Sequence, residues 1–275
     1  MGEAKQKKSA TARLIAQYPI CALCGERAST TRDHVPPISL FDNSLRPDKL
    51  VIPACDTCNR GTSTSDLIVV IISRWNYYSD HQERKDHPRL VARLRKQCPE
   101  VIQEWIRLDN DGRERARAHL IKQGVNVPPD AGLSSIGEIT IRHLNLFSYK
   151  FGLAIYFEHF KKPLSANGAI TAIWRTKEDF RNLGVPKELL DLLPRYATLQ
   201  QGNWQTTKDF EYRFDLNSQE GLLGCVARFR SSLFITAFAV EDYEVLPPES
   251  RTPDWIRSAE LLTILQRPEF RRRLQ

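Results

Sequence analysis

The sequence lacks an apolar run long enough to cross a membrane. Its longest uninterrupted apolar run covers residues 67–72, whereas a bilayer-spanning helix needs about 20 apolar residues. Residues 1–17 are basic, but they contain neither an apolar core of signal-peptide length nor a small-residue cleavage site. These absences argue against membrane binding and export, so we expect a cytoplasmic protein.

The sequence also lacks internal repeats and low-complexity tracts, and its excess of basic residues is modest. With 41% hydrophobic and 27% charged residues, its composition is that of a packed globular protein. A chain of 275 residues can form one large domain or two ordinary ones. The formal net charge of +7 favours a polyanionic partner such as nucleic acid, although charge alone does not identify one.

Cysteines are few, and four of the six fall into two Cys-x-x-Cys pairs. In a reducing compartment such pairs indicate metal binding and not disulfides. Four thiolates are the donor set of a closed tetrahedral zinc site, which holds the fold but activates no water. We predict one structural zinc ion, with the ligands Cys21, Cys24, Cys55 and Cys58. The two remaining cysteines, Cys98 and Cys225, are predicted core residues.

The chain divides into three predicted parts. Residues 1–80 would form the zinc-stapled module, residues 81–130 a helical connector, and residues 131–275 a C-terminal domain. The loop 124–137, which contains prolines and glycines, marks the last boundary. We expect an α+β fold, in which the zinc-stapled module is followed by helices packed on an antiparallel sheet.

Hydrophobic periodicity and turn residues predict the main elements. Helical spacing of apolar residues predicts helices at residues 4–17, at 82–124 with a break at Pro99, and at 136–162. Aromatic and β-branched residues between turn signals predict an antiparallel meander of residues 209–217, 221–230 and 233–241. The tail from Trp255 is predicted to be helical.

A motif lies between and after the cysteine pairs. Asp33 and His34 precede Pro37 in an Asp-His-x-x-Pro stretch, and the second pair runs directly into Asn59, Arg60 and Gly61. This combination resembles the zinc-containing HNH (ββα-metal) nucleases, and the last run is similar to the HNH domain of CRISPR effector nucleases. The resemblance covers residues 18–79, and it is specific because several motif elements occur together. It implies an N-terminal ββα-metal, treble-clef-like module with the four-cysteine zinc.

The resemblance implies a metal-dependent endonuclease that hydrolyses phosphodiester bonds with one divalent cation. His34 would be the general base that deprotonates water, and Asp33 and Asn59 would bind a catalytic Mg²⁺ or Mn²⁺. These residue types suit the reaction, because a histidine titrates near neutral pH and a carboxylate and an amide oxygen are hard ligands. The expected substrate is DNA, with RNA less favoured, and one such site would nick a single strand.

One position departs from the family pattern. The family has an Asn just before the apolar strand that leads into the second knuckle, where this chain has Asp48, Lys49 and Leu50. That Asn is thought to brace the loop and orient the base, so its replacement is open; Asn43 is one candidate. Asp66 could approach the metal from the following helix, or it could be a solvated or capping acid.

Several basic residues are predicted to contact phosphate, although a solvated role is an equal alternative for most of them. They are Arg60, Arg89, Arg93 and Lys96. The C-terminal domain would select the target or a partner, which includes a second copy of the chain. The family's usual settings suggest phage defence or restriction.

A second interpretation is a non-catalytic treble-clef zinc module that binds nucleic acid or protein. In this interpretation the only role of three side chains would be to form hydrogen bonds within the loop: Asp33, His34 and Asn59. Loss of the middle Asn favours this alternative, whereas retention of Asp-His and Cys-Asn together disfavours it, because zinc coordination needs neither. The remaining histidines are not predicted to take part: His81, His87, His119, His143 and His159.

Overall fold

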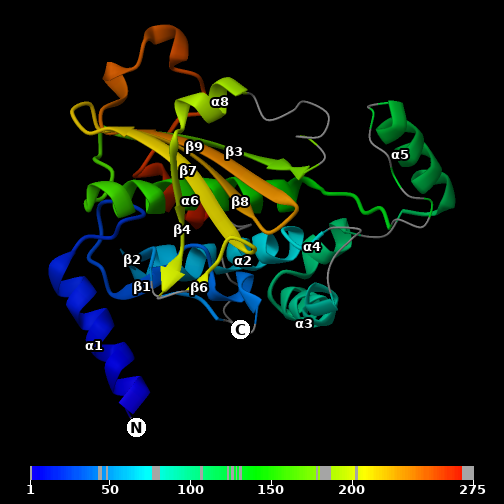
Figure 1. Cartoon of the computed structure of the whole chain (residues 1–275), viewed down its shortest axis with the longest axis horizontal. Coiled ribbons are helices and arrows are strands. Elements are labelled where there is room, and N and C mark those ends of the chain that lie inside the picture. Colours follow the sequence, from blue (N-terminus) through cyan, green and yellow to red (C-terminus); the bar gives the residue numbers. More distant parts are fainter. Residues whose placement is uncertain are drawn as a thin grey trace.

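The computed structural model describes residues 2–42, 45–47, 49–75, 81–105, 108–122, 124, 127, 129, 132–177, 179, 187–201 and 204–267. Its long central helix, α6 (Glu138–Phe160), lies between a large antiparallel sheet and the N-terminal elements (Figure 1). The protein is therefore layered as sheet, central helix and N-terminal module. The predicted α+β fold class is confirmed.

The N-terminal module has the predicted ββα order. Strand β1 (Thr31–His34) pairs antiparallel with β2 (Val51–Ala54), and helix α2 (Asp56–Ile72) follows. Helix α1 (Gly2–Gln17) precedes this module and projects from it (Figure 1), and the short 3₁₀ helix η1 (Ile38–Leu40) lies between the strands. Helix α2 contains the longest apolar run of the chain, and it packs against α6.

The connector forms more helices than expected. Pro99 begins a new helix, as predicted, but the segment contains α3 (His81–Gln97), α4 (Pro99–Glu104) and α5 (Asn110–Lys122). The prediction of two helices is wrong because α4 ends at Glu104. The Glu104 carboxylate accepts hydrogen bonds from the backbone of Ile139 and Thr140 in the first turn of α6, at 2.7 and 2.8 Å. The hydrophobic periodicity of one segment cannot reveal this cap, because its two partners lie 35 and 36 residues from Glu104 in the sequence.

The C-terminal sheet has six strands in the order β10-β3-β9-β8-β7-β4. The predicted meander is confirmed as β7 (Phe210–Asn217), β8 (Leu222–Phe229) and β9 (Leu233–Val240). The sequence did not predict the flanking strands β3 (Ala169–Thr176), β4 (Arg195–Thr198) and β10 (Ile256–Arg257). Smaller elements complete the described chain: β5 (Gln200–Gln201), β6 (Trp204–Gln205), α8 (Lys187–Leu192), η3 (Tyr243–Val245), η4 (Pro248–Ser250) and α9 (Glu260–Gln266).

The tail differs from its prediction at one point. A helix was expected from Trp255, but Ile256 and Arg257 pair with β3 as strand β10 before α9 begins. The reason is tertiary, because β3 offers a free edge to these residues. None of the helices in the described ranges combines the length and the apolar character that a bilayer span requires.

One continuous hydrophobic core joins the layers, with buried residues that run from Cys21 to Leu265. Helix α6 is buried along most of its length. It approaches the sheet closely at Gly152, where an added Cβ atom would lie 2.5 Å from Ile170 Cδ1 and 2.9 Å from Ala237 Cβ. The absence of a side chain at this position lets the helix pack directly against β3 and β9.

We expect Gly152→Val to lower the free energy of unfolding by about 1–3 kcal/mol, because the added methyl groups overpack the helix–sheet contact. Denaturant unfolding followed by circular dichroism measures the change. Ile141→Ala is the matched control on the same helix, since Ile141 is exposed and surface changes usually stay within about 0.5 kcal/mol. Equal losses for the two variants would contradict close packing at Gly152.

Candidate metal centre and catalytic pocket

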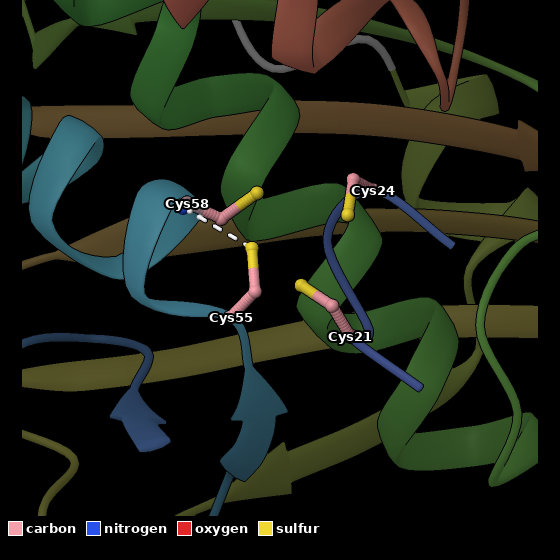
Figure 2. A group of neighbouring side chains, drawn as sticks. All are labelled: Cys21, Cys24, Cys55 and Cys58. Carbon is pink, nitrogen blue, oxygen red and sulfur yellow. Dashed lines mark hydrogen bonds between the residues drawn. The ribbon is translucent and has the colours of Figure 1, made fainter. Parts of the chain in front are cut away.

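The two cysteine pairs form one buried cluster. The four Sγ atoms lie within 4.8 Å of one another, close to the ~3.8 Å that tetrahedral zinc with 2.3 Å bonds to sulfur requires. Figure 2 shows Cys55 and Cys58 at the start of α2, facing Cys21 and Cys24 of the first knuckle. The structure thus brings together the four predicted ligands, which can bind zinc.

Backbone geometry holds the two knuckles in place. Gly25 adopts a φ of 66°, which favours glycine, and its N–H donates to Cys21 O at 2.9 Å to close the first knuckle. Ala22 N donates to Pro53 O at 2.9 Å, which ties this knuckle to β2. Cys55 caps α2 by accepting from Cys58 N at 3.4 Å. The metal centre therefore spans both strands and the helix.

Hydrogen bonds among the four thiols raise the pKa of two of them and lower the pKa of the other two. The bond to Cys21 is the largest cause that lowers the pKa of Cys24, and it lowers that of Cys55 to about 7. The pKa of Cys21 rises, chiefly through Cys24, and that of Cys58 rises, chiefly through Cys21. Protons are thus shared unevenly within the cluster, and zinc binding would release them.

A pocket of about 400 Å³ lies beside the metal centre, over β1, η1 and the first half of α2. It contains all three residues predicted to carry chemistry: Asp33, His34 and Asn59. Its remaining lining residues are Arg32, Pro37, Ile38, Ser39, Ser63, Asp66, Leu67 and Arg93. The pocket therefore combines carboxylates, an imidazole, an amide and two guanidinium groups.

Asp33 and His34 reach the same pocket although they are neighbours on a strand. Side chains alternate between the two faces of a regular strand, but β1 ends at His34. Asp33 is buried, with 6% of its surface exposed, and His34 is half-buried. The end of the strand lets an inward carboxylate and a neighbouring imidazole line one cavity.

Asn59 connects the helix to the first strand. Its Nδ2 donates to Thr31 Oγ1 at 2.7 Å and to Arg32 O at 3.3 Å. Both bonds use the amide nitrogen, and no hydrogen bond within the described ranges uses Oδ1. The amide oxygen is the atom of Asn59 that a hard cation would prefer.

Arg46 braces the loop that follows His34. Its guanidinium donates to Pro36 O at 2.9 Å, Leu50 O at 3.2 Å and Val35 O at 3.4 Å. This arginine therefore braces the backbone of the loop in which the resemblance expects an Asn. Sequence reasoning missed it, because a lone arginine in a loop carries no signal. Asn43 and Asp48 lie outside the described residues.

Lys150 is a further residue of the site that the sequence did not predict. It comes from the middle of α6 and has 0% exposed surface. Its Nζ donates to Asp66 Oδ1 at 2.8 Å and Oδ2 at 2.9 Å, and it lies 2.8 Å from Asp33 Oδ2. The 2.8 Å contact with Asp33 is a charge-assisted ion pair, and the buried Oδ2 has no other polar partner in the described part of the chain.

Burial and charge act in opposite directions on this cluster. Burial raises the pKa of Asp66 to about 6, while the Lys150 ammonium opposes the rise. Burial alone would lower the pKa of Lys150, but the Asp33 and Asp66 carboxylates outweigh it and hold that pKa above its usual value. Lys150 therefore stays protonated between the two carboxylates.

The four basic residues predicted to contact phosphate do not lie together, and only one of them lines the pocket. Arg93 of α3 lines the pocket, as does Arg32, which the sequence did not single out. Arg60 is exposed and pairs with Asp56 at 2.7 Å, and Arg89 is exposed and lies 3.4 Å from Asp86. Lys96 is exposed on α3. Arg60, Arg89 and Lys96 do not line the pocket.

The histidines and cysteines that were not predicted to take part lie elsewhere. His143 Nδ1 and Ser65 Oγ form a buried hydrogen bond of 2.8 Å between α6 and α2. The His159 ring stacks on Phe214 with centroids 4.0 Å apart. Cys98 and Cys225 are buried outside the four-cysteine cluster. His87 and His119 do not line the pocket, and the side chain of His81 lies outside the described residues.

We expect the purified protein to hold about one zinc per chain, and Cys55→Ala to lose it and unfold the N-terminal module, because the ligands bridge β2 and α2. Elemental analysis and thermal unfolding measure the two effects. Cys98→Ala is the control: it also removes a buried thiol, but from outside the cluster, and it should retain zinc. Full zinc content in Cys55→Ala would show that the ligand set is different.

Comparison of the chain with protein-family models, with curated proteins and with solved structures found no match. The function is therefore inferred from the geometry and chemistry of the pocket and from the resemblance of its motif.

Proposed function

We propose that the protein is a metal-dependent endonuclease that nicks DNA by a one-metal HNH mechanism. The observation that carries the proposal is that Asp33, His34 and Asn59 line one pocket, next to a four-cysteine cluster on a ββα unit. Residues distributed by chance over β1 and α2 need not share a cavity. The resemblance and the basic net charge support DNA as the substrate, with RNA as the alternative polymer.

The residues present fit a hard divalent cation. Asp33 and Asn59 both line the pocket, and the described hydrogen bonds of Asn59 use its Nδ2 and not its amide oxygen. Carboxylate and amide oxygens are ligands that Mg²⁺ and Mn²⁺ accept. Asp33 and Asn59 would hold the ion, which when bound supplies positive charge against the charge developing on the phosphate and the leaving oxygen.

The chain's own side chains would do the remaining chemistry. His34 would accept the proton of the attacking water, a role that histidine fills most often in general acid–base catalysis. Arg32 and Arg93 would bind the phosphate by charge-assisted hydrogen bonds. Arg46 holds the carbonyl groups around Val35, Pro36 and Leu50, and this would keep the His34 backbone in position. Residues 131–275 would select the target or partner, in a setting such as phage defence or restriction.

A non-catalytic zinc module is the second candidate, and Lys150 is the observation that favours it. Its ammonium already lies 2.8 Å from Asp33 Oδ2, so a positive charge is present beside the proposed cation ligand. In this interpretation the ion pair replaces the metal and the pocket only binds a partner. The two candidates differ in whether supercoiled plasmid is nicked when Mg²⁺ or Mn²⁺ is added.

We expect His34→Ala to reduce the nicking rate by ~10² to 10⁴-fold, because a general base is lost. Zinc content, melting temperature and DNA affinity should stay near wild type, since His34 is not among the clustered thiols and acts in the transition state. Relaxation of supercoiled plasmid over time measures the rate. His119→Ala, which changes an exposed histidine outside the pocket, is the control and should nick normally. A fully active His34→Ala would favour the non-catalytic module.

We expect Arg93→Ala to weaken DNA binding more than Arg89→Ala. Both variants remove one positive charge from an exposed position on α3, but Arg93 lines the pocket, whereas Arg89 lies outside it, beside Asp86. A lost phosphate contact should weaken binding across sequences and reduce the salt slope by about 1. Fluorescence anisotropy with labelled duplex in the His34→Ala background measures both without cleavage. Equal effects of the two variants would mean that this pocket is not where phosphate binds.

A further inference from the structure

Lys150 is buried in a place where a lysine is costly. Removing an ammonium from water carries a penalty of several kcal/mol that a buried pair often only balances. An apolar side chain at this position of α6 would pack without that cost, as its neighbours Phe147, Phe151 and Ala154 do. Stability alone therefore does not explain a lysine at this position. Its two partners, Asp33 and Asp66, suggest another reason.

The charges of the cluster do not balance. Asp33 and Asp66 together carry two negative charges and Lys150 carries one positive charge. The excess negative charge lies at the wall of the pocket, since both aspartates line it. Arg32 and Arg93 also line the pocket, and the positive charge of Arg93 acts on Asp66. The negative excess is therefore local to the cluster of Asp33, Lys150 and Asp66, and a cation would bind beside it.

The contact also restricts the orientation of Asp33. Lys150 lies against Oδ2, which is buried, and α2 holds the lysine through both oxygens of Asp66. The contact of Lys150 with Asp33 is through Oδ2, which leaves Oδ1 as the other carboxylate oxygen. Only one carboxylate oxygen is then available to a ligand in the pocket, next to His34 on the same strand.

We propose that Lys150 is a positioning residue of the cation site: it holds Asp33 so that one oxygen serves the cation, while Asp66 restores the negative charge that the ammonium would cancel. This proposal rests on the proposed nuclease function. It makes α6, and with it the C-terminal part of the chain, a structural component of the site. Lys150 itself would touch neither substrate nor cation.

Binding of Mn²⁺ to the zinc-loaded full-length protein, followed by electron paramagnetic resonance, tests the proposal without measuring activity. Asp66→Asn should weaken binding about 10- to 100-fold, the usual effect of losing a partner of a metal ligand. Asp215→Asn is the control, because it makes the same change of charge on the sheet, beside Arg195. Equal binding by Asp66→Asn and Asp215→Asn would remove Asp66 from the proposal.

The double variant Lys150→Met with Asp66→Asn separates position from charge. It leaves the cluster with the wild-type net charge but without the contact to Asp33. If Lys150 positions Asp33, the double variant binds Mn²⁺ about 10- to 100-fold more weakly than wild type. Wild-type affinity in the double variant would overturn the positioning role and leave the nuclease proposal intact, whereas no binding by the wild-type protein would overturn both.

A measurement on the wild-type protein covers the case in which the double variant does not fold. In ¹⁵N-lysine-labelled protein, the buried Lys150 ammonium should give a slowly exchanging signal because it donates to Asp66. Mg²⁺ bound through Asp33 must shift that signal, since ammonium and ion share one carboxylate. The Lys150→Met spectrum assigns it. An unchanged signal at saturating Mg²⁺ would overturn the proposal, and exposed Lys96 provides an internal reference.

Discussion

The burial of helix α2 is the constraint on which the rest of the structure depends. Residues 67–72 have at most 2% of their surface exposed, and burying each such side chain contributes roughly 1.5–3 kcal/mol. Because residues 67–72 are buried on every side, this part of the helix can pack in only one position. The residues in the rest of α2 are placed with it. Cys58 and Asn59 lie in its first turns and Asp66 lies further along. The metal centre and one wall of the pocket therefore follow from hydrophobic packing.

Three long-range contacts link α2 to its surroundings. The thiol cluster links its start to the first knuckle, and Lys150 links its middle to α6 and β1. At its end, Arg74 donates to Ser39 O at 2.9 Å and to Leu40 O at 3.0 Å. Arg230 of the β8–β9 turn donates to the same Leu40 O at 2.7 Å. The loop that forms one side of the pocket is thus held from the helix and from the C-terminal sheet.

These links unite two kinds of chemistry. A four-thiol zinc site is closed, so a zinc ion bound there would be structural. The oxygen donors and the imidazole lie in the adjacent pocket. In the proposed nuclease this separation would let the structural ion remain bound while the hydrolytic ion and the substrate exchange. The role proposed for Lys150 concerns the second of these sites.

Local sequence by itself determined the four thiols, the long helix and the meander, because each depends on spacing or periodicity within one segment. The resemblance of the motif supplied the ββα order and selected Asp33, His34 and Asn59, which share a pocket. Only the tertiary structure revealed that Lys150 and Arg46 belong to the site and that the connector contains a third helix. Lys150 lies 84 residues from Asp66 in a helix whose periodicity indicates only a core, and no local pattern shows which distant carboxylates a buried ammonium will meet.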